Sequence, residues 1–191
     1  MWPWGHLAFA YVTYRGWTRL RGRAAIAGGT LGILILGALA PDLVDKPLAW
    51  TLSILPSGRS LAHSLLTAGV LGAGSVLLIR NPGRRRQAGV FLFGYVGHIL
   101  ADAVPDLVAG DPEALFFWNW PFAPHPTLSN DYSFVGQLSE LGGQLRLLVA
   151  GEFSALGWVG IELIFVLLVG LLWLVDGAPG CPCLELGRHR H

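Results

Sequence analysis

Residues 94–102 read GYVGHILAD, and they lie inside an apolar run from Ala88 to Val108. The run is long enough to cross a membrane as a helix, which takes about 20 residues. Two of its residues, His98 and Asp102, are spaced i,i+4, so a helix places both on one face, one turn apart. An aspartate in a spanning helix costs about 2.5–3.5 kcal/mol near the bilayer centre. We therefore expect this pair to have a partner or a function.

The composition indicates an integral membrane protein. Of the 191 residues, 53% are hydrophobic and 13% are charged, and the mean hydropathy is +0.54. Soluble domains carry about 25% charged residues. The formal net charge is only +1, so no overall basic field favours a nucleic acid, and we expect the lipid bilayer as the main partner.

Five apolar segments predict an all-α membrane protein with about five transmembrane helices, the first of them short. The segments are 4–17, 24–40, 61–79, 88–108 and 153–175. Pro41 is expected to end the second segment, and Pro105 to break the fourth. We expect one transmembrane domain over residues 1–176 and a short cytoplasmic tail over 177–191.

The outer loop between the last two segments contains a further helical pattern. Apolar residues recur at helical spacing over residues 135–149, with polar residues between them. This pattern is typical of an amphipathic helix that lies on the outer surface or caps the bundle.

The arginines predict the orientation of the chain. Ten of the 13 Lys and Arg residues lie at the end of the first segment, between the first and second segments, between the third and fourth, or in the tail: Arg15, Arg19, Arg21, Arg23, Arg80, Arg84, Arg85, Arg86, Arg188 and Arg190. Alternating segments place all of them on one side, which the positive-inside rule makes cytoplasmic. Most of the acidic residues then lie on the outer side.

This orientation brings histidines and aspartates from four segments to the same outer level. The candidate metal ligands are His6, Asp42, Asp45, His63, His98 and Asp102. Mixed His and Asp ligands suit a divalent transition metal such as Zn²⁺, Mn²⁺ or Fe²⁺ better than Ca²⁺ or Mg²⁺, and we favour Zn²⁺ or Mn²⁺. Arg59 is the candidate for stabilising negative charge in a reaction at this site.

The ordered motifs resemble a known family. They are Pro41-Asp42-Leu43-Val44-Asp45, then Arg59-Ser60-Leu61-Ala62-His63-Ser64, then His98 to Asp102, then Trp120-Pro121-Phe122. This order is similar to that of the YdjM-type membrane-bound metal-dependent hydrolases, whose pattern is H…PDxD…HRGxTHS…HxxxD followed by WPF. The resemblance covers roughly residues 1–125. The resemblance implies metal-dependent hydrolysis. The orientation from the arginines places the site on the outer side near the bilayer surface, which favours an amphiphilic small-molecule substrate such as a phosphoester or another lipid-associated molecule.

The chain departs from that pattern at several positions. The second aspartate of PDxD falls at Val44, and Asp45 comes one residue later. The histidine of HRG falls at Gly58, while its glycine and threonine fall at Ser60 and Ala62. The missing histidine removes one ligand or acid–base group, so a non-catalytic protein with a degenerate site stays an alternative.

Other interpretations of these residues also remain open. The His98–Asp102 pair could hold helices together through a hydrogen bond, and Asp45 could pair with Lys46 or Arg59 instead of binding metal. A metal or ion transporter would use the same cluster, but it would need a polar route through the inner halves of the segments, which are apolar. Glu162, inside the fifth segment, is expected to pair across helices or to be protonated.

Overall fold

The computed structural model describes residues 1–22, 26–123, 133–152 and 157–181, and these residues contain helices and no strand. The elements are α1 (Pro3–Leu20), α2 (Gly28–Lys46), the π-helical turn η1 (Pro47–Thr51), α3 (Leu65–Leu78), α4 (Pro82–Val108), the 3₁₀ helix η2 (Pro112–Asn119), α5 (Phe134–Ala150) and α6 (Gly157–Val175). The expectation of an all-helical membrane fold is confirmed.

Five of these helices fall on the five apolar segments, and three of them are long and apolar enough to cross a membrane. These are α2 continued by η1 (Gly28–Thr51), α4 and α6. Helix α3, with 14 residues, is shorter than the roughly 20 residues of a full crossing. Helix α1 has 18 residues but is not among the three candidate spans.

The expected effect of the two prolines was wrong. Pro41 lies inside α2, which continues to Lys46 and then through η1, and Pro105 lies inside α4, which continues to Val108. A proline in a helix lacks the N–H that would bond to the carbonyl four residues earlier, but the remaining bonds of the helix can hold it when neighbouring helices pack around it. Pro41 is fully buried. Asp42 and Asp45 are therefore helical residues and do not follow a helix end.

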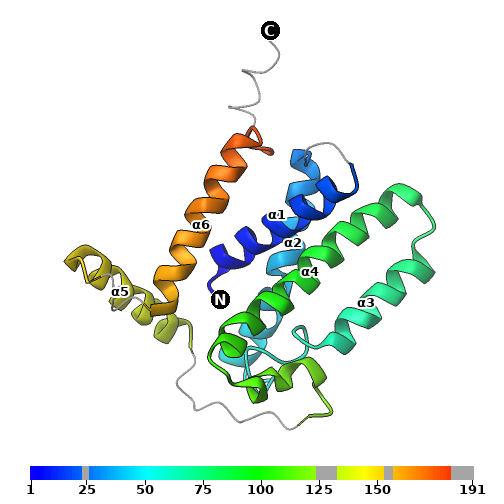
Figure 1. The fold of residues 1–191 in the computed structure, drawn as a ribbon. Coiled ribbons are helices and arrows are strands. Elements are labelled where there is room, and N and C mark those ends of the chain that lie inside the picture. Colours follow the sequence, from blue (N-terminus) through cyan, green and yellow to red (C-terminus); the bar gives the residue numbers. More distant parts are fainter. Residues whose placement is uncertain (23–25, 124–132, 153–156, 182–191) are drawn as a thin grey trace.

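Helix α4 is central to the bundle and packs against α1, α2 and α3 (Figure 1). Its closest neighbour is α2. A Cβ on Gly37 would lie 2.1 Å from the Phe91 carbonyl oxygen, and one on Gly94 would lie 2.4 Å from the Leu34 carbonyl oxygen. The two backbones thus approach where neither helix has a side chain, as small residues allow in membrane helix pairs.

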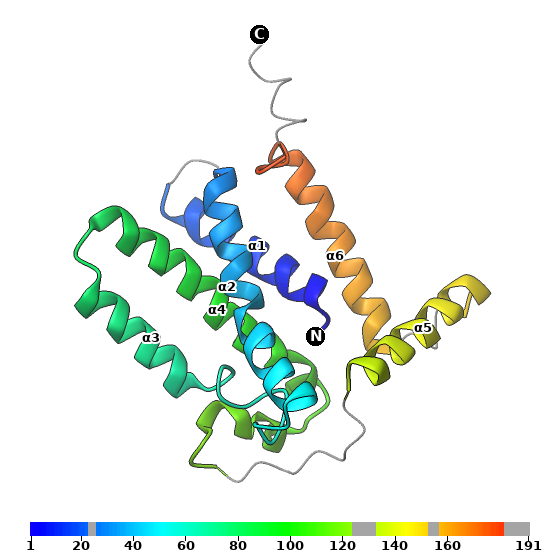
Figure 2. The ribbon, with the colours of Figure 1, turned by 180° about the vertical axis from the view of Figure 1, so that it is seen from behind.

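The predicted outer amphipathic helix is present as α5, and it lies to the side of the bundle on which α6 is found (Figure 2). The Ser133 hydroxyl accepts a hydrogen bond from Gly136 N–H at its start, and Gly151 ends it with φ 76°. None of its residues is buried. Its apolar side chains, such as Val135 and Leu138, remain available to a lipid surface.

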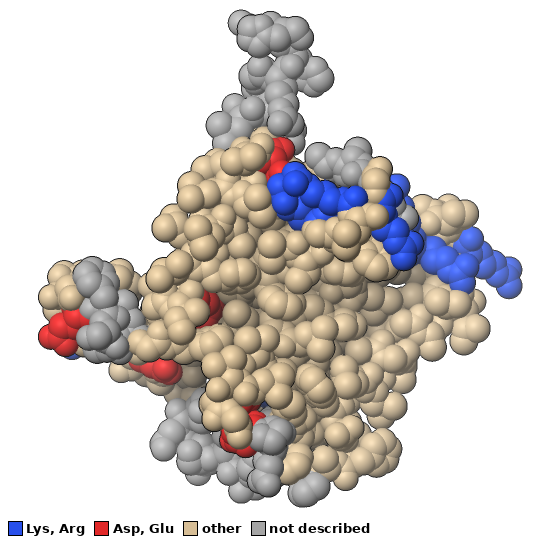
Figure 3. Space-filling view, in the orientation of Figure 1, with Lys and Arg blue, Asp and Glu red and all other residues tan. Residues whose placement is uncertain are grey.

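Basic side chains gather at one end of the molecule (Figure 3). They come from the end of α1 and the start of α4, where Arg84, Arg85 and Arg86 lie. At this end Arg15 and Arg19 form ion pairs with Asp176, which follows α6. The hydrogen bond from Arg15 lowers the pKa of Asp176. These pairs tie α1 to α6 at the end opposite the histidines.

Candidate metal centre

Four of the six candidate ligands meet in one buried group. Asp42, His63, His98 and Asp102 each offer a ligand atom, and these atoms all lie within 4.8 Å of one another. Asp42 comes from the last turns of α2, His63 from the segment before α3, and His98 and Asp102 from one face of α4. All four side chains are buried. Three segments that are distant in the sequence therefore converge on one point.

Helix α4 carries the pair from which the sequence prediction started. The i,i+4 spacing places His98 Nε2 3.8 Å from Asp102 Oδ2. The His98 ring is fixed on the side away from Asp102, where its Nδ1 lies 2.6 Å from the carbonyl oxygen of Ala38 on α2. A carbonyl only accepts, so Nδ1 must carry the proton and Nε2 is left as an acceptor that faces the group of four.

Asp45 holds His63 in the same way. Its Oδ2 lies 2.8 Å from His63 Nδ1. Its carboxylate also accepts hydrogen bonds from the backbone N–H groups of Ser60, Ala62 and His63. Both carboxylate oxygens of Asp45 thus accept hydrogen bonds from the segment before α3, and Asp45 lies beside the candidate ligand His63, outside the group of four. His63 Nδ1 then carries a proton, and its Nε2 faces the other ligands.

Asp45, and not residue 44, lies on the same side of α2 as Asp42. Residues 42 and 45 lie on the same side of a helix, since a spacing of three returns to nearly the same face. Val44 points elsewhere and is 41% exposed. Because α2 continues helically beyond Pro41, an aspartate at 45 reaches His63, which one at position 44 would not.

The two histidines face each other with acceptor nitrogens. His63 Nε2 and His98 Nε2 are 3.1 Å apart, while both Nδ1 atoms are occupied as donors. Neutral rings would turn two lone pairs toward each other, whereas a proton on His63 Nε2 would make this contact a hydrogen bond to His98. In addition, Asp42 Oδ1 is buried and has no hydrogen-bond partner among the described residues. A proton between the two nitrogens or a cation among the four residues would satisfy this arrangement, so the group could hold a metal ion.

The separations fit a four-ligand ion. A tetrahedral site with ligand bonds of about 2.0–2.1 Å has ligand atoms about 3.3 Å apart. His63 Nε2 lies 3.5 Å from both Asp42 Oδ1 and Asp102 Oδ2. His98 Nε2 lies 3.7 Å from Asp42 Oδ1. These residues are thus suitable in type and in spacing for a divalent transition metal.

Each carboxylate turns its second oxygen outward to a positive charge. Asp42 Oδ2 forms an ion pair with Lys46 one turn later on α2. Asp102 Oδ1 lies 2.9 Å from the Met1 amino group. One oxygen of each aspartate is therefore neutralised from outside, and the other is directed to the histidines.

His6 lies beside the group of four. Its ring stacks on that of His98 with centroids 3.7 Å apart, and its Nε2 is 3.2 Å from Asp102 Oδ1. This approach is within ion-pair distance but is not directed as a hydrogen bond, and neither ring nitrogen has a hydrogen-bond partner among the described residues. His6 therefore lies level with His98 and Asp102, and its role as a ligand stays a prediction.

Arg59 lies at the edge of the centre. Its guanidinium group pairs with Asp106 at 3.0 Å and lies 5.3 Å from the Phe117 ring centroid. The Phe117 ring in turn packs edge-on against His63, with centroids 6.1 Å apart. The Arg59 side chain is 41% exposed. A cation therefore lies one aromatic ring away from a candidate ligand.

Sequence reasoning missed the groups that position the ligands. Tyr95 donates its hydroxyl hydrogen to the Ala62 carbonyl oxygen, next to His63. Ser57 and Ser60 hydrogen-bond within the same segment. Glu162 was not missed: as expected for a residue that pairs across helices, it is fully buried on α6 and accepts the N–H of Trp2, just before α1, at 2.9 Å. The polar residues of an otherwise apolar chain were the available signal, but their partners are distant in the sequence.

Comparison with known proteins identifies the family of the chain. Searches of curated proteins and of solved structures found no match. A family model described as "YdjM inner membrane protein" matches residues 1–178, which is nearly the whole chain. The match extends beyond the motifs and includes α6. The chain belongs to the YdjM inner membrane protein family.

Proposed function

We propose that the chain is a membrane-embedded, metal-dependent hydrolase whose ion is bound by Asp42, His63, His98 and Asp102. One observation carries the proposal: two histidines held through Nδ1 turn their Nε2 atoms toward each other at 3.1 Å. A single proton could bridge those nitrogens, but the buried Asp42 Oδ1 would still accept no hydrogen bond from the described residues. A divalent cation satisfies both nitrogens and both inward carboxylate oxygens.

A metal bound there would lower the pKa of a bound water and polarise a substrate oxygen. The residues of the chain supply the other requirements of hydrolysis. His6 offers an imidazole beside Asp102 that makes no hydrogen bond to the described residues, so it can accept the proton that an attacking water would lose. Arg59 lies near His63 through Phe117, and it can stabilise the negative charge that develops on a phosphoester or ester oxygen.

The orientation of the site is part of the proposal. The basic residues of α1 and α4 lie at one end, and Asp102 is 18 residues beyond Arg84 on α4, about 27 Å along the helix. The positive-inside rule makes the arginine end cytoplasmic. The metal centre would then open to the extracytoplasmic side, near the bilayer surface.

A metal transporter is the competing function, and the packing of the inner half argues against it. The described residues of α1, α2 and α4 form an apolar core that includes Ala10, Tyr14, Leu34 and Val90. An ion would have to cross this core without polar ligands, at a cost of several kcal/mol.

Metal analysis of the purified protein tests the site. We expect about one transition-metal ion per chain, lost in both His98→Ala and Asp102→Ala. Glu140→Gln, which changes an exposed carboxylate on α5, is the control and should keep the metal. Full retention of metal in both site variants would rule out this centre.

Activity separates an enzyme from a binding protein. The metal-loaded wild type should hydrolyse phosphoester or lipid ester substrates, and the metal-free variants should not. If the loaded protein in proteoliposomes moves metal across the bilayer and hydrolyses nothing, the transporter is the better description.

A further inference from the structure

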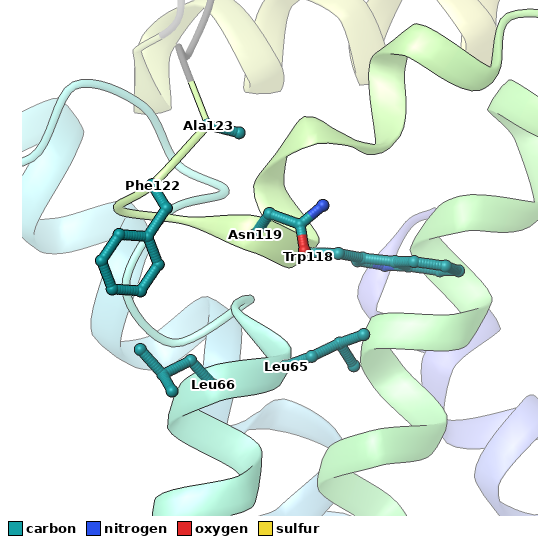
Figure 4. Close-up of a pocket in the computed structure, with 6 residues that line it drawn as sticks. All are labelled: Leu65, Leu66, Trp118, Asn119, Phe122 and Ala123. Atoms are coloured by element: carbon teal, nitrogen blue, oxygen red, sulfur yellow. The ribbon is translucent and has the colours of Figure 1, made fainter.

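A pocket of about 520 Å³ lies at the outer end of the bundle, close to the metal centre. Its lining residues are Leu65, Leu66, Trp118, Asn119, Phe122 and Ala123 (Figure 4). Five of the six are apolar, and Asn119 supplies the one polar side chain of the lining. The volume is within the range of about 300–1,000 Å³ found for small-molecule sites.

Both walls of the pocket continue directly into the metal centre. On one wall, Leu65 begins α3 only two residues after His63. On the other, Trp118 follows Phe117, whose ring packs against the ring of His63. Ser64 joins the walls by donating a hydrogen bond to the Trp120 carbonyl oxygen at 2.7 Å. A ligand in the pocket would therefore lie next to the proposed metal ion.

The pocket is also continuous with a surface that faces lipid. In α3 only Ala68 is buried, while Leu66, Val70 and Leu77 are 50%, 63% and 76% exposed. Exposed apolar side chains on a helix of an inner membrane protein lie against acyl chains. A hydrocarbon chain could move from the bilayer along α3 into the pocket without crossing water, so its transfer carries little desolvation cost.

We propose that this pocket binds an acyl chain of a membrane lipid and thereby places the lipid head group at the metal centre. The inference rests on the proposed function and names its substrate class, an acyl lipid with an anionic head group. Arg59, 41% exposed and stacked on Phe117, is the cation that the head group would meet. Helix α3 starts at the pocket and runs toward the arginine-rich end, which is the direction that a lipid tail takes from an outer head group.

Photocrosslinking in proteoliposomes tests the pocket directly. The probe is phosphatidylglycerol with a photoreactive diazirine on one acyl chain, and crosslinked peptides are mapped by mass spectrometry. We expect crosslinks on Leu65, Leu66 and Phe122. Leu66→Trp fills the pocket and should lower crosslinking there about tenfold, the effect of losing two buried methylene contacts.

Val70→Trp is the matched control. It adds the same side chain one turn further along α3, at a position that is also exposed but does not line the pocket, and it should leave the pocket crosslinks unchanged. Metal content is measured in all three proteins. If Leu66→Trp keeps its metal and its pocket crosslinks, the lipid pocket is wrong and the metal-dependent function survives. If the wild type binds no metal but crosslinks specifically in the pocket, the proposed function fails and the lipid site remains.

Discussion

The tetrapeptide Pro-Asp-Leu-Val occurs twice, at 41–44 in α2 and at 105–108 in α4, and its two aspartates have different environments. Asp42 is buried in the group of four, with Oδ1 directed at the two histidines. Asp106 lies at the edge, with a side chain that is 21% exposed and paired with Arg59. The same four residues thus supply a candidate metal ligand in one helix and an ion pair in the other.

The difference follows from where the two helices cross. They approach at Gly37 and Gly94, and both run from the arginine-rich end to the end where the candidate ligands lie. Asp42 is five residues beyond Gly37, about 8 Å along the helix, whereas Asp106 is twelve residues beyond Gly94, about 18 Å. On α4, the level of Asp42 is instead occupied by His98 and Asp102. The distance of each Pro-Asp-Leu-Val tetrapeptide from the contact between α2 and α4 therefore decides whether its aspartate reaches the histidines.

The largest expected effect separates these two aspartates. Asp42→Asn should lower metal affinity about 100-fold or more, because it removes a charged ligand, which is worth more than the 10–100-fold of a supporting residue. Asp106→Asn should change the affinity by less than about threefold, since Asp106 faces Arg59. Competition with a fluorescent chelator measures both. An equal loss of metal affinity in the two variants would show that the position of the helix crossing does not give the two aspartates different roles.

A smaller effect is expected one turn beyond Asp42. Asp45→Asn keeps all four ligands but weakens the support of His63 Nδ1 and of three backbone N–H groups. We expect metal affinity to fall about 10–100-fold. The position three residues after Asp106 is Ala109, so α4 has no equivalent support. Wild-type affinity in Asp45→Asn would mean that the peptide segment, and not the carboxylate, orients His63.

The glycine crossing can be tested by adding a methyl group. Gly94→Ala places a Cβ 2.4 Å from the Leu34 carbonyl oxygen, so the helices must separate, at a cost of about 1–3 kcal/mol of stability. Gly89→Ala, on the same helix, meets nothing within 4 Å and should be neutral or slightly stabilising. Denaturation in mild detergent compares them. Reduced metal affinity in Gly94→Ala alone would connect the crossing to the site.

The smallest expected change concerns the ion pair of the second tetrapeptide. Arg59→Ala breaks a partly exposed contact with Asp106, so stability should fall by less than about 1 kcal/mol. Metal content should stay at the wild-type level, and hydrolysis of anionic lipids should decrease. Loss of metal in Arg59→Ala would instead place this residue among the groups that support the centre.

The sequence predicted the structure correctly where it depends on the periodicity of apolar residues or on the free-energy cost of an ionisable residue in an apolar helix. The i,i+4 pair on α4 lies on one face as expected, and the apolar segments became helices. The outer pattern at 135–149 became α5. The expected effect of Pro41 was wrong, because local propensity does not include the neighbours that hold a buried proline in a helix. That error matters, since only a helical α2 aligns Asp42 with Asp45.

By itself, the sequence determined that the chain is helical and apolar, that it carries few charges, and that His98 and Asp102 share a helix face. These properties depend on composition and on spacing within one element. The tertiary structure alone decided which residues meet. Asp45 and the Ala38 carbonyl accept hydrogen bonds from the Nδ1 atoms of His63 and His98, and Asp106 forms an ion pair with Arg59. Such contacts depend on the level at which two helices cross, and that level is set by the close approach of backbones at two glycines.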